Sequence, residues 1–161
     1  MKSVDIRLDT MSVAYIKDMV GRRMVRYKCD PFVFSTAVYG IVGVIVDDWA
    51  YAFTNRLETM DYFGQIEDVA IFRLSKCQEG DIQSLLEGEV LVDTPVGSKI
   101  KEIQIVNEHQ KLYEDEVQTY DVWLTRGIVF ILEDGLEIAL EKNVWFKVNY
   151  AKFQYVPAKI K

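Results

Sequence analysis

The chain has 161 residues, of which 50% are hydrophobic and 27% are charged, and its formal net charge is −6. A chain of this size can build a core without metals or disulfides, and its apolar content excludes a disordered protein. The acidic balance argues against a nucleic-acid-binding domain, because such domains are normally basic. We therefore expect a single domain over residues 1–156, followed by a loose polar tail at 157–161.

The beginning of the chain and its cysteines indicate the compartment. The first ten residues hold four charged side chains, so they cannot form the apolar centre of a signal peptide. The longest apolar run, residues 38–46, is too short to cross a bilayer. Cys29 and Cys77 belong to no CxxC pair, which favours two free thiols and leaves one long-range disulfide as the alternative. We expect a cytoplasmic protein that does not contact membranes.

The first half of the chain predicts one helix and a β-hairpin. Residues 12–21 have helical periodicity, with Ser12 as N-cap and Gly21 just beyond the end. Asp47-Asp48 separates two apolar runs and predicts the turn of the hairpin. Strands are expected at residues 24–28, 40–46, 49–53 and 69–74.

The second half predicts a short helix and a second hairpin. The helix spans residues 81–88, and Pro95 and Gly97 indicate a turn after it. Asp134-Gly135 lies between two apolar runs and predicts a hairpin with a type I′ turn. Strands are expected at residues 100–106, 117–124, 127–133, 136–141 and 146–155.

The two hairpins resemble each other in sequence. When the chain is shifted by 87 residues, Gly40-Ile41-Val42 falls on Gly127-Ile128-Val129, and Asp47 falls on Asp134. This match predicts two pseudo-repeats, at about 12–76 and 81–156. The alternative is that any two hairpins with apolar arms look alike.

These elements define the expected fold class. We expect a mainly β (α+β) fold, either a β-sandwich or a partly open barrel. It would be built from the two hairpin-containing pseudo-repeats, because a lone hairpin is barely stable in water, with one or two short helices added.

Few residues offer catalytic chemistry. His109 is the one histidine, and without a recognisable partner we interpret it as an ordinary surface residue. The carboxylate pairs Asp47-Asp48 and Glu67-Asp68 could do acid–base work, but a turn and an ordinary strand explain them better. We expect no metal, because His and Cys are too few and no calcium-loop pattern occurs, and no cofactor.

A basic cluster near the N-terminus does not form a nucleic-acid-binding stripe. Arg22 and Arg26 are expected on one face of a strand and Arg23 on the other, with Lys28 further along. We therefore expect no nucleic-acid partner.

The distribution of charge supports a binding function. Residues 1–28 carry a balance of +4 and residues 142–161 one of +5, whereas residues 47–141 carry −14. Within that middle, Glu114, Asp115 and Glu116 form an acidic triplet.

The leading hypothesis is a non-catalytic protein that binds a basic protein partner through Glu114, Asp115 and Glu116, in one version by neutralising a toxin. One alternative is a β-barrel that binds a small apolar or aromatic ligand with Trp49, Tyr51, Phe53 and Phe130. Another is an enzyme that uses carboxylates alone. A homo-oligomer is compatible with the sequence.

Overall fold

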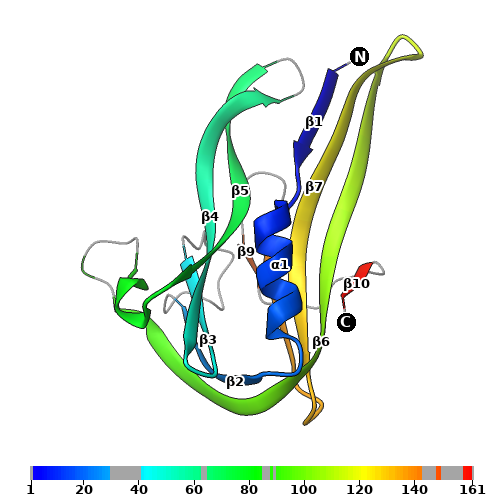
Figure 1. The fold of residues 1–161 in the computed structure, drawn as a ribbon. Helices are drawn as coiled ribbons and strands as arrows, with labels where there is room; N and C mark the ends of the chain where they lie inside the picture. Colours follow the sequence, from blue (N-terminus) through cyan, green and yellow to red (C-terminus); the bar gives the residue numbers. More distant parts are fainter. Residues whose placement is uncertain are drawn as a thin grey trace.

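Ten strands form one sheet that curls into a partly open barrel, with a single α-helix at its side (Figure 1). The computed structural model describes residues 2–29, 41–62, 65–84, 88, 90–142, 148–149 and 158–160, without the side chains of 55–70 and 141–160. The elements in chain order are β1 (Lys2–Ile6), α1 (Thr10–Met19), β2 (Arg23–Cys29), β3 (Ile41–Val46), β4 (Trp49–Tyr62), β5 (Gln65–Cys77), the 3-10 turn η1 (Glu79–Asp81), β6 (Val92–Glu114), β7 (Val117–Leu132), β8 (Glu137–Lys142), β9 (Val148–Asn149) and β10 (Ala158–Ile160). The expected mainly β class, in its barrel form, is confirmed.

The strand order is β5-β4-β3-β2-β6-β7-β8-β9, and all of these neighbours are antiparallel. β1 adds to β7 in parallel, and β10 adds to β6. The tail was expected to be loose, but Ala158–Ile160 pairs with Ile103–Ile105 of β6. The strand expected at 146–155 lies mostly outside the described residues, which include only β9 from it.

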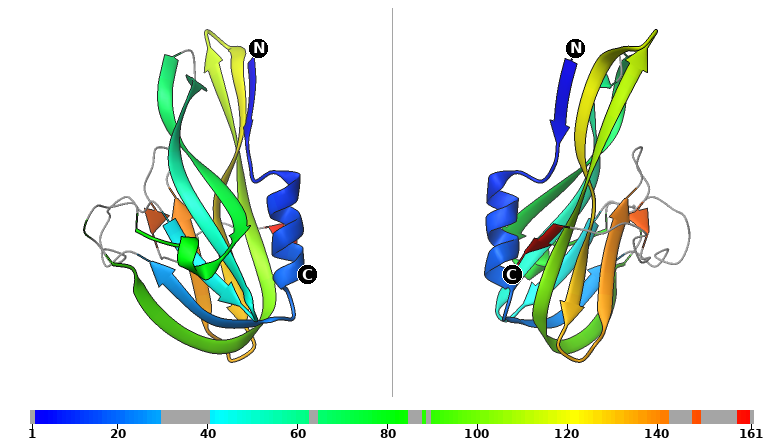
Figure 2. Two further views of the ribbon diagram at one scale, coloured as in Figure 1. Left: turned by 60° about the vertical axis from the view of Figure 1, so that its left-hand side comes forward. Right: turned by 90° about the vertical axis from the view of Figure 1, so that its right-hand side faces the viewer.

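The barrel interior is filled by apolar side chains that alternate along the strands. Phe53 of β4 and Phe130 of β7 meet edge to face at 5.9 Å between ring centroids, and both are almost fully buried. α1 packs Ile16 and Met19 into the same core and contacts both β5 and β6, so it closes the side of the barrel between them (Figure 2). Alternation with period two therefore places one face of each strand inside.

The helix begins earlier than its sequence predicts. Asp9 is the N-cap, since its carboxylate accepts a hydrogen bond from the Ser12 amide at 2.7 Å. Ser12 lies buried inside the helix, and its hydroxyl donates to the Leu74 carbonyl at the edge of β5. Gly21 follows the end with φ +87°, as the sequence predicts.

The second predicted helix is only partly described. Its beginning is the 3-10 turn η1, which ends at Asp81, and residues 82–84 are irregular. Residues 85–87 lie outside the described residues. Ile82 is nevertheless buried, because it packs on the face of β3 at Gly43.

The second hairpin forms, but not with the predicted type I′ turn. β7 and β8 are joined around a three-residue loop in which only Gly135 has positive φ, at +90°. The amide of Gly135 donates to the Leu132 carbonyl at 3.0 Å, and that of Leu132 donates to the Leu136 carbonyl. This is the geometry of a type I turn followed by a left-handed residue. One consequence is that Leu136 is 48% exposed, so the inward-facing residues of β8 begin at Ile138.

Gly135→Val should lower the free energy of unfolding by about 1 kcal/mol or more, because a branched side chain must adopt positive φ. A Cβ added at this glycine would have no atom within 4 Å, so crowding contributes nothing. Gly80→Val is the control, since Gly80 has the same open space without positive φ. Urea unfolding of both variants measures the difference, and an equal cost would contradict the assignment.

Pro95 and Gly97 do not form the predicted turn but lie within β6. Met24 pairs with Ser98 and Arg26 with Pro95, so one residue of β2 faces two of β6. Gly97 has φ +69° in this bulge. Proline and glycine are tolerated in strands at such bulges, so Pro95 and Gly97 do not end the strand.

The strand order is symmetric about the pairing of β2 with β6. β2–β3–β4 and β6–β7–β8 are both antiparallel meanders, and β2 pairs with β6 between them. This is the topology that the pseudo-repeat requires. The repeat itself stays a prediction until the two halves are superposed.

Both cysteines are free, as the sequence favours. Cys29 is buried in the barrel core, and Cys77 is half-buried on the opposite face of the sheet. Burial raises the pKa of the Cys77 thiol, and nearby Asp81 adds to the effect. Neither environment favours a reactive thiolate.

Candidate functional site

The acidic triplet occupies the tip of the long β6–β7 hairpin (Figure 1). Glu114 ends β6 and pairs with Val117 at the start of β7. Asp115 and Glu116 form the two-residue turn, both with positive φ, at 48° and 68°. All three carboxylates therefore lie at one end of the molecule, and all three residues are exposed.

The hairpin extends beyond the barrel as an arm with β1 along β7 (Figures 1 and 2). One face of this arm is apolar: Val4, Ile6, Val122 and Leu124 form a small core with Ile71 of β5. Because β1 stops pairing at Tyr120, the last residues of the hairpin are a two-stranded ribbon. The arm is thus anchored at its base and free at its tip.

Apolar side chains flank the tip. Tyr113 is 55% exposed and Val117 is 64% exposed. An aromatic residue beside charged groups is a typical component of a protein interface.

The tip carboxylates are unpaired. Among the residues that the structure describes, none of Glu114, Asp115 and Glu116 forms an ion pair or a side-chain hydrogen bond. Elsewhere on the same hairpin Glu108 accepts from Arg126 at 2.9 Å. Among the described residues, carboxylates paired with basic side chains therefore lie on the barrel and toward the base of the arm, and not at its tip.

The basic N-terminal segment lies on other acids. Arg22 pairs with Asp18 and Asp47, and its guanidinium pKa is raised by Asp18 first and then by Asp47. Arg26 pairs with Glu79 and Asp93. The segment thus neutralises part of the acidic middle but leaves the hairpin tip charged.

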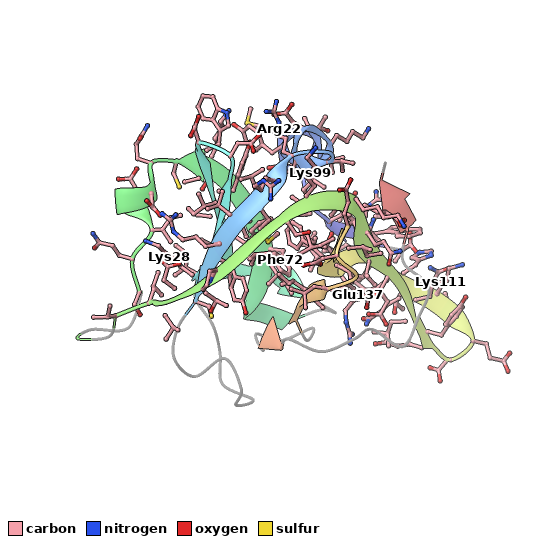
Figure 3. All side chains as sticks on the ribbon, turned by 90° about the horizontal axis from the view of Figure 1, so that it is seen from below. Arg22, Lys28, Phe72, Lys99, Lys111 and Glu137 are labelled. Carbon is pink, nitrogen blue, oxygen red and sulfur yellow. The ribbon has the colours of Figure 1, made fainter. Side chains whose placement is uncertain are left out.

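The predicted division, with Arg22 and Arg26 on one strand face and Arg23 on the other, does not occur, because Arg22 lies before β2 and a bulge interrupts the alternation between Met24 and Arg26. Lys28 shares Glu79 with Arg26, whereas Arg23 faces Lys99 across the β2–β6 pair. Figure 3 shows Arg22 and Lys99 close to each other, with Lys28 and Lys111 far to either side. No continuous basic stripe results among the described residues.

His109 has a partner that the sequence does not reveal. Its Nε2 contacts the carboxylate of Asp121, and its ring stacks on Trp123 at 3.9 Å between centroids and 7° between planes. His109 and Trp123 are directly opposite in the β6–β7 register. His109 is exposed, as expected of a surface residue, but nothing in the sequence indicated its partner Asp121, because cross-strand register cannot be read from alternation alone.

The polar contacts around His109 and Trp123 continue onto Arg7, the residue that follows β1. The guanidinium carbon of Arg7 lies 4.9 Å from the centre of the Trp123 ring. Arg7 also donates two hydrogen bonds to Asp5, from Nε at 2.9 Å and from Nη2 at 2.7 Å. The side-chain hydrogen bond from Arg7 lowers the pKa of Asp5.

An open cleft of about 590 Å³ begins at Arg7, where β1 turns into α1. The lining comes from β1 and the corner that follows it, from α1, from β5 and from β6. The lining residues are Asp5, Arg7, Leu8, Asp9, Thr10, Val13, Arg73, Ile105 and Asn107. None of these residues was predicted to form a site, since they come from three separate stretches of the chain, residues 5–13, residue 73 and residues 105–107.

Of the two candidate carboxylate pairs, Asp47-Asp48 has described side chains and Glu67-Asp68 does not. Asp47-Asp48 is the turn between β3 and β4, and Asp47 has φ +51° and accepts from Arg22. Glu67-Asp68 lies in β5 at positions whose side chains are outside those described. In the part of the chain that is described, no three His, Cys, Asp or Glu side chains gather as metal ligands would.

Three of the four aromatic residues considered as the lining of a ligand pocket, Tyr51, Phe53 and Phe130, form part of the core instead. Tyr51, Phe53 and Phe130 are at most 2% exposed and pack into the barrel interior. Burial raises the pKa of Tyr51. Trp49 is 47% exposed at the barrel end, where the Lys76 ammonium lies 3.5 Å from its ring centre.

Comparison of the chain with known protein families, curated proteins and solved structures gave no match. Within the described residues, no helix has the length and apolar character needed to cross a membrane.

Proposed function

We propose that the protein is a non-catalytic binding protein that engages a basic protein partner through the tip of the β6–β7 hairpin. The observation that supports the proposal is the set of three unneutralised carboxylates, Glu114, Asp115 and Glu116, at the free end of an anchored arm. Opposite charges accelerate encounter between proteins and favour the correct partner.

The surroundings of the tip support contact as well as attraction. Tyr113 and Val117 would supply apolar area beside the carboxylates, which long-range charge alone does not provide. A narrow ribbon also fits a concave surface better than a flat one. A protein that blocks the cleft of a basic toxin or nuclease is one version of this function.

The proposal predicts that association depends on the tip charges. The variant Glu114→Gln/Asp115→Asn/Glu116→Gln should associate with the partner more slowly, on the order of tenfold at low salt. Its folding should be nearly unchanged, because exposed charges contribute little to stability. Raising ionic strength from 0.01 M to 0.1 M shortens the Debye length from about 30 Å to about 10 Å and should reduce the difference.

The experiment first identifies a partner by affinity capture from the native cell with the wild-type protein and the tip variant in parallel. Stopped-flow association with the purified partner then gives the rates. A matched control removes three charges at the opposite end of the molecule, Asp48→Asn/Glu133→Gln/Asp134→Asn. The proposal would be contradicted if the association rate did not change with ionic strength and if the tip variant and the control variant altered it equally.

A further inference from the structure

The cleft between β1, α1, β5 and β6 has the dimensions of a small-molecule site. Its volume of about 590 Å³ falls within the range of about 300–1,000 Å³ that is usual for such sites. It lies beside α1, which packs between β5 and β6. Its location differs from that of the hairpin tip.

The guanidinium of Arg7 is held in place before any ligand arrives. Asp5 accepts hydrogen bonds from two of its five N–H groups, and its guanidinium carbon lies 4.9 Å from the centre of the Trp123 ring. Three N–H groups remain, including both on Nη1, and no described residue accepts from Nη1. A fixed arginine with free, coplanar donors suits a planar carboxylate.

Asn107 supplies a second donor from β6. Its Oδ1 accepts a hydrogen bond from the Thr125 hydroxyl at 2.8 Å, which leaves the amide NH₂ to donate. The same Thr125 oxygen accepts from the Leu8 amide at 2.9 Å. Thr125 is fully buried. It therefore holds both the Asn107 side chain and the backbone at Leu8 in place.

The other residues that line the cleft indicate which chemical groups a ligand would carry besides its carboxylate. Leu8, Val13 and Ile105 offer apolar contact. Asp5 and Asp9 also line the cleft, and Asp9 is already engaged with the Ser12 amide. Two resident carboxylates would repel a second negative charge on a ligand, so a monoanion that contacts Arg7 fits this lining better than a dianion does.

We propose that this cleft binds a small monocarboxylic acid whose carboxylate contacts Arg7 and Asn107 and whose apolar body packs on Leu8, Val13 and Ile105. The binding requires no change in the Asp5–Arg7 pair. It is independent of the proposed protein-binding function at the hairpin tip.

Titration with benzoate tests the proposal, with benzamide as the uncharged comparison of similar shape. The readout is the methyl NMR signals of Leu8, Val13 and Ile105 in the full chain. We expect saturable shifts of these signals with a dissociation constant on the order of 1 mM for so small a ligand. Benzamide should bind at least tenfold more weakly.

Two variants and one control locate the site. Arg7→Gln removes the cation and should weaken benzoate binding at least tenfold, while Val13→Phe should fill the cleft and abolish the shifts. Arg23→Gln removes an exposed arginine on the β2–β6 pair and should leave binding unchanged. The proposal is overturned if benzoate at about ten times the expected constant leaves the three signals unmoved, or if folded Arg7→Gln binds it as tightly as the wild type.

Discussion

Replacing Phe130 by alanine is expected to lower the free energy of unfolding by about 3–5 kcal/mol. Phe130 is fully buried at the centre of the barrel and contacts Phe53 edge to face. Removal of its ring deletes apolar burial and leaves a cavity that the antiparallel strands on either side cannot close. Because domains of this size are stable by only about 5–15 kcal/mol, the variant should be marginally folded.

Urea unfolding followed by circular dichroism measures this loss. Tyr113→Ala is the control, since it removes an aromatic ring that is 55% exposed, and its cost should stay within about 0.5 kcal/mol. A double-mutant cycle with Phe53→Ala should show a coupling of about 0.5–1.5 kcal/mol for the aromatic pair. A loss below about 1 kcal/mol for Phe130→Ala would mean that the barrel interior is not packed around this ring.

Gly43→Ala should also destabilise the protein, by about 1–3 kcal/mol, although it adds a single methyl group. A Cβ at Gly43 would lie 2.6 Å from Cγ2 and 2.8 Å from Cδ1 of Ile82. β3 is central, paired with both β2 and β4, so its backbone cannot move away. The Ile82 side chain must therefore shift within the apolar cluster that covers Ile41 and Ile45.

Equilibrium unfolding of three variants separates this collision from other effects. Gly80→Ala, where no atom lies within 4 Å, should change stability little. In Gly43→Ala/Ile82→Ala the smaller side chain relieves the clash, so the double variant should lose less than the sum of the single losses. Strictly additive losses would show that Ile82 does not occupy the space above Gly43.

The local patterns of the sequence determined much of the fold. Alternating apolar residues identified both hairpins. They also predict one inward face for each second arm, formed by Trp49, Tyr51 and Phe53 and by Leu136, Ile138 and Leu140. Four of these six residues are buried, whereas Trp49 and Leu136, next to the turns, are 47% and 48% exposed. Gly21 marked the end of the helix through its positive φ. These features depend on neighbours within a few residues, so a single chain segment carries the information.

Some local signals were overruled by tertiary pairing. Pro95 and Gly97 look like a turn, but β2 lies alongside them and accommodates both in a bulge. Asp134-Gly135 looks like a type I′ turn, but the register of β7 and β8 adds a residue to the loop. In each case the pairing of whole strands contributes more to the stability of the fold than the turn geometry that the two residues prefer locally.

The candidate sites divide in the same way. The acidic triplet is contiguous in sequence, so composition alone identified Glu114, Asp115 and Glu116, although not their position at the tip of an arm. The His109–Asp121 contact, the Arg7–Trp123 contact and the cleft bring together residues from β1 and the corner after it, α1, β5, β6 and β7. Such contacts depend on the registers of strands up to about a hundred residues apart, which long-range packing decides and local periodicity does not encode.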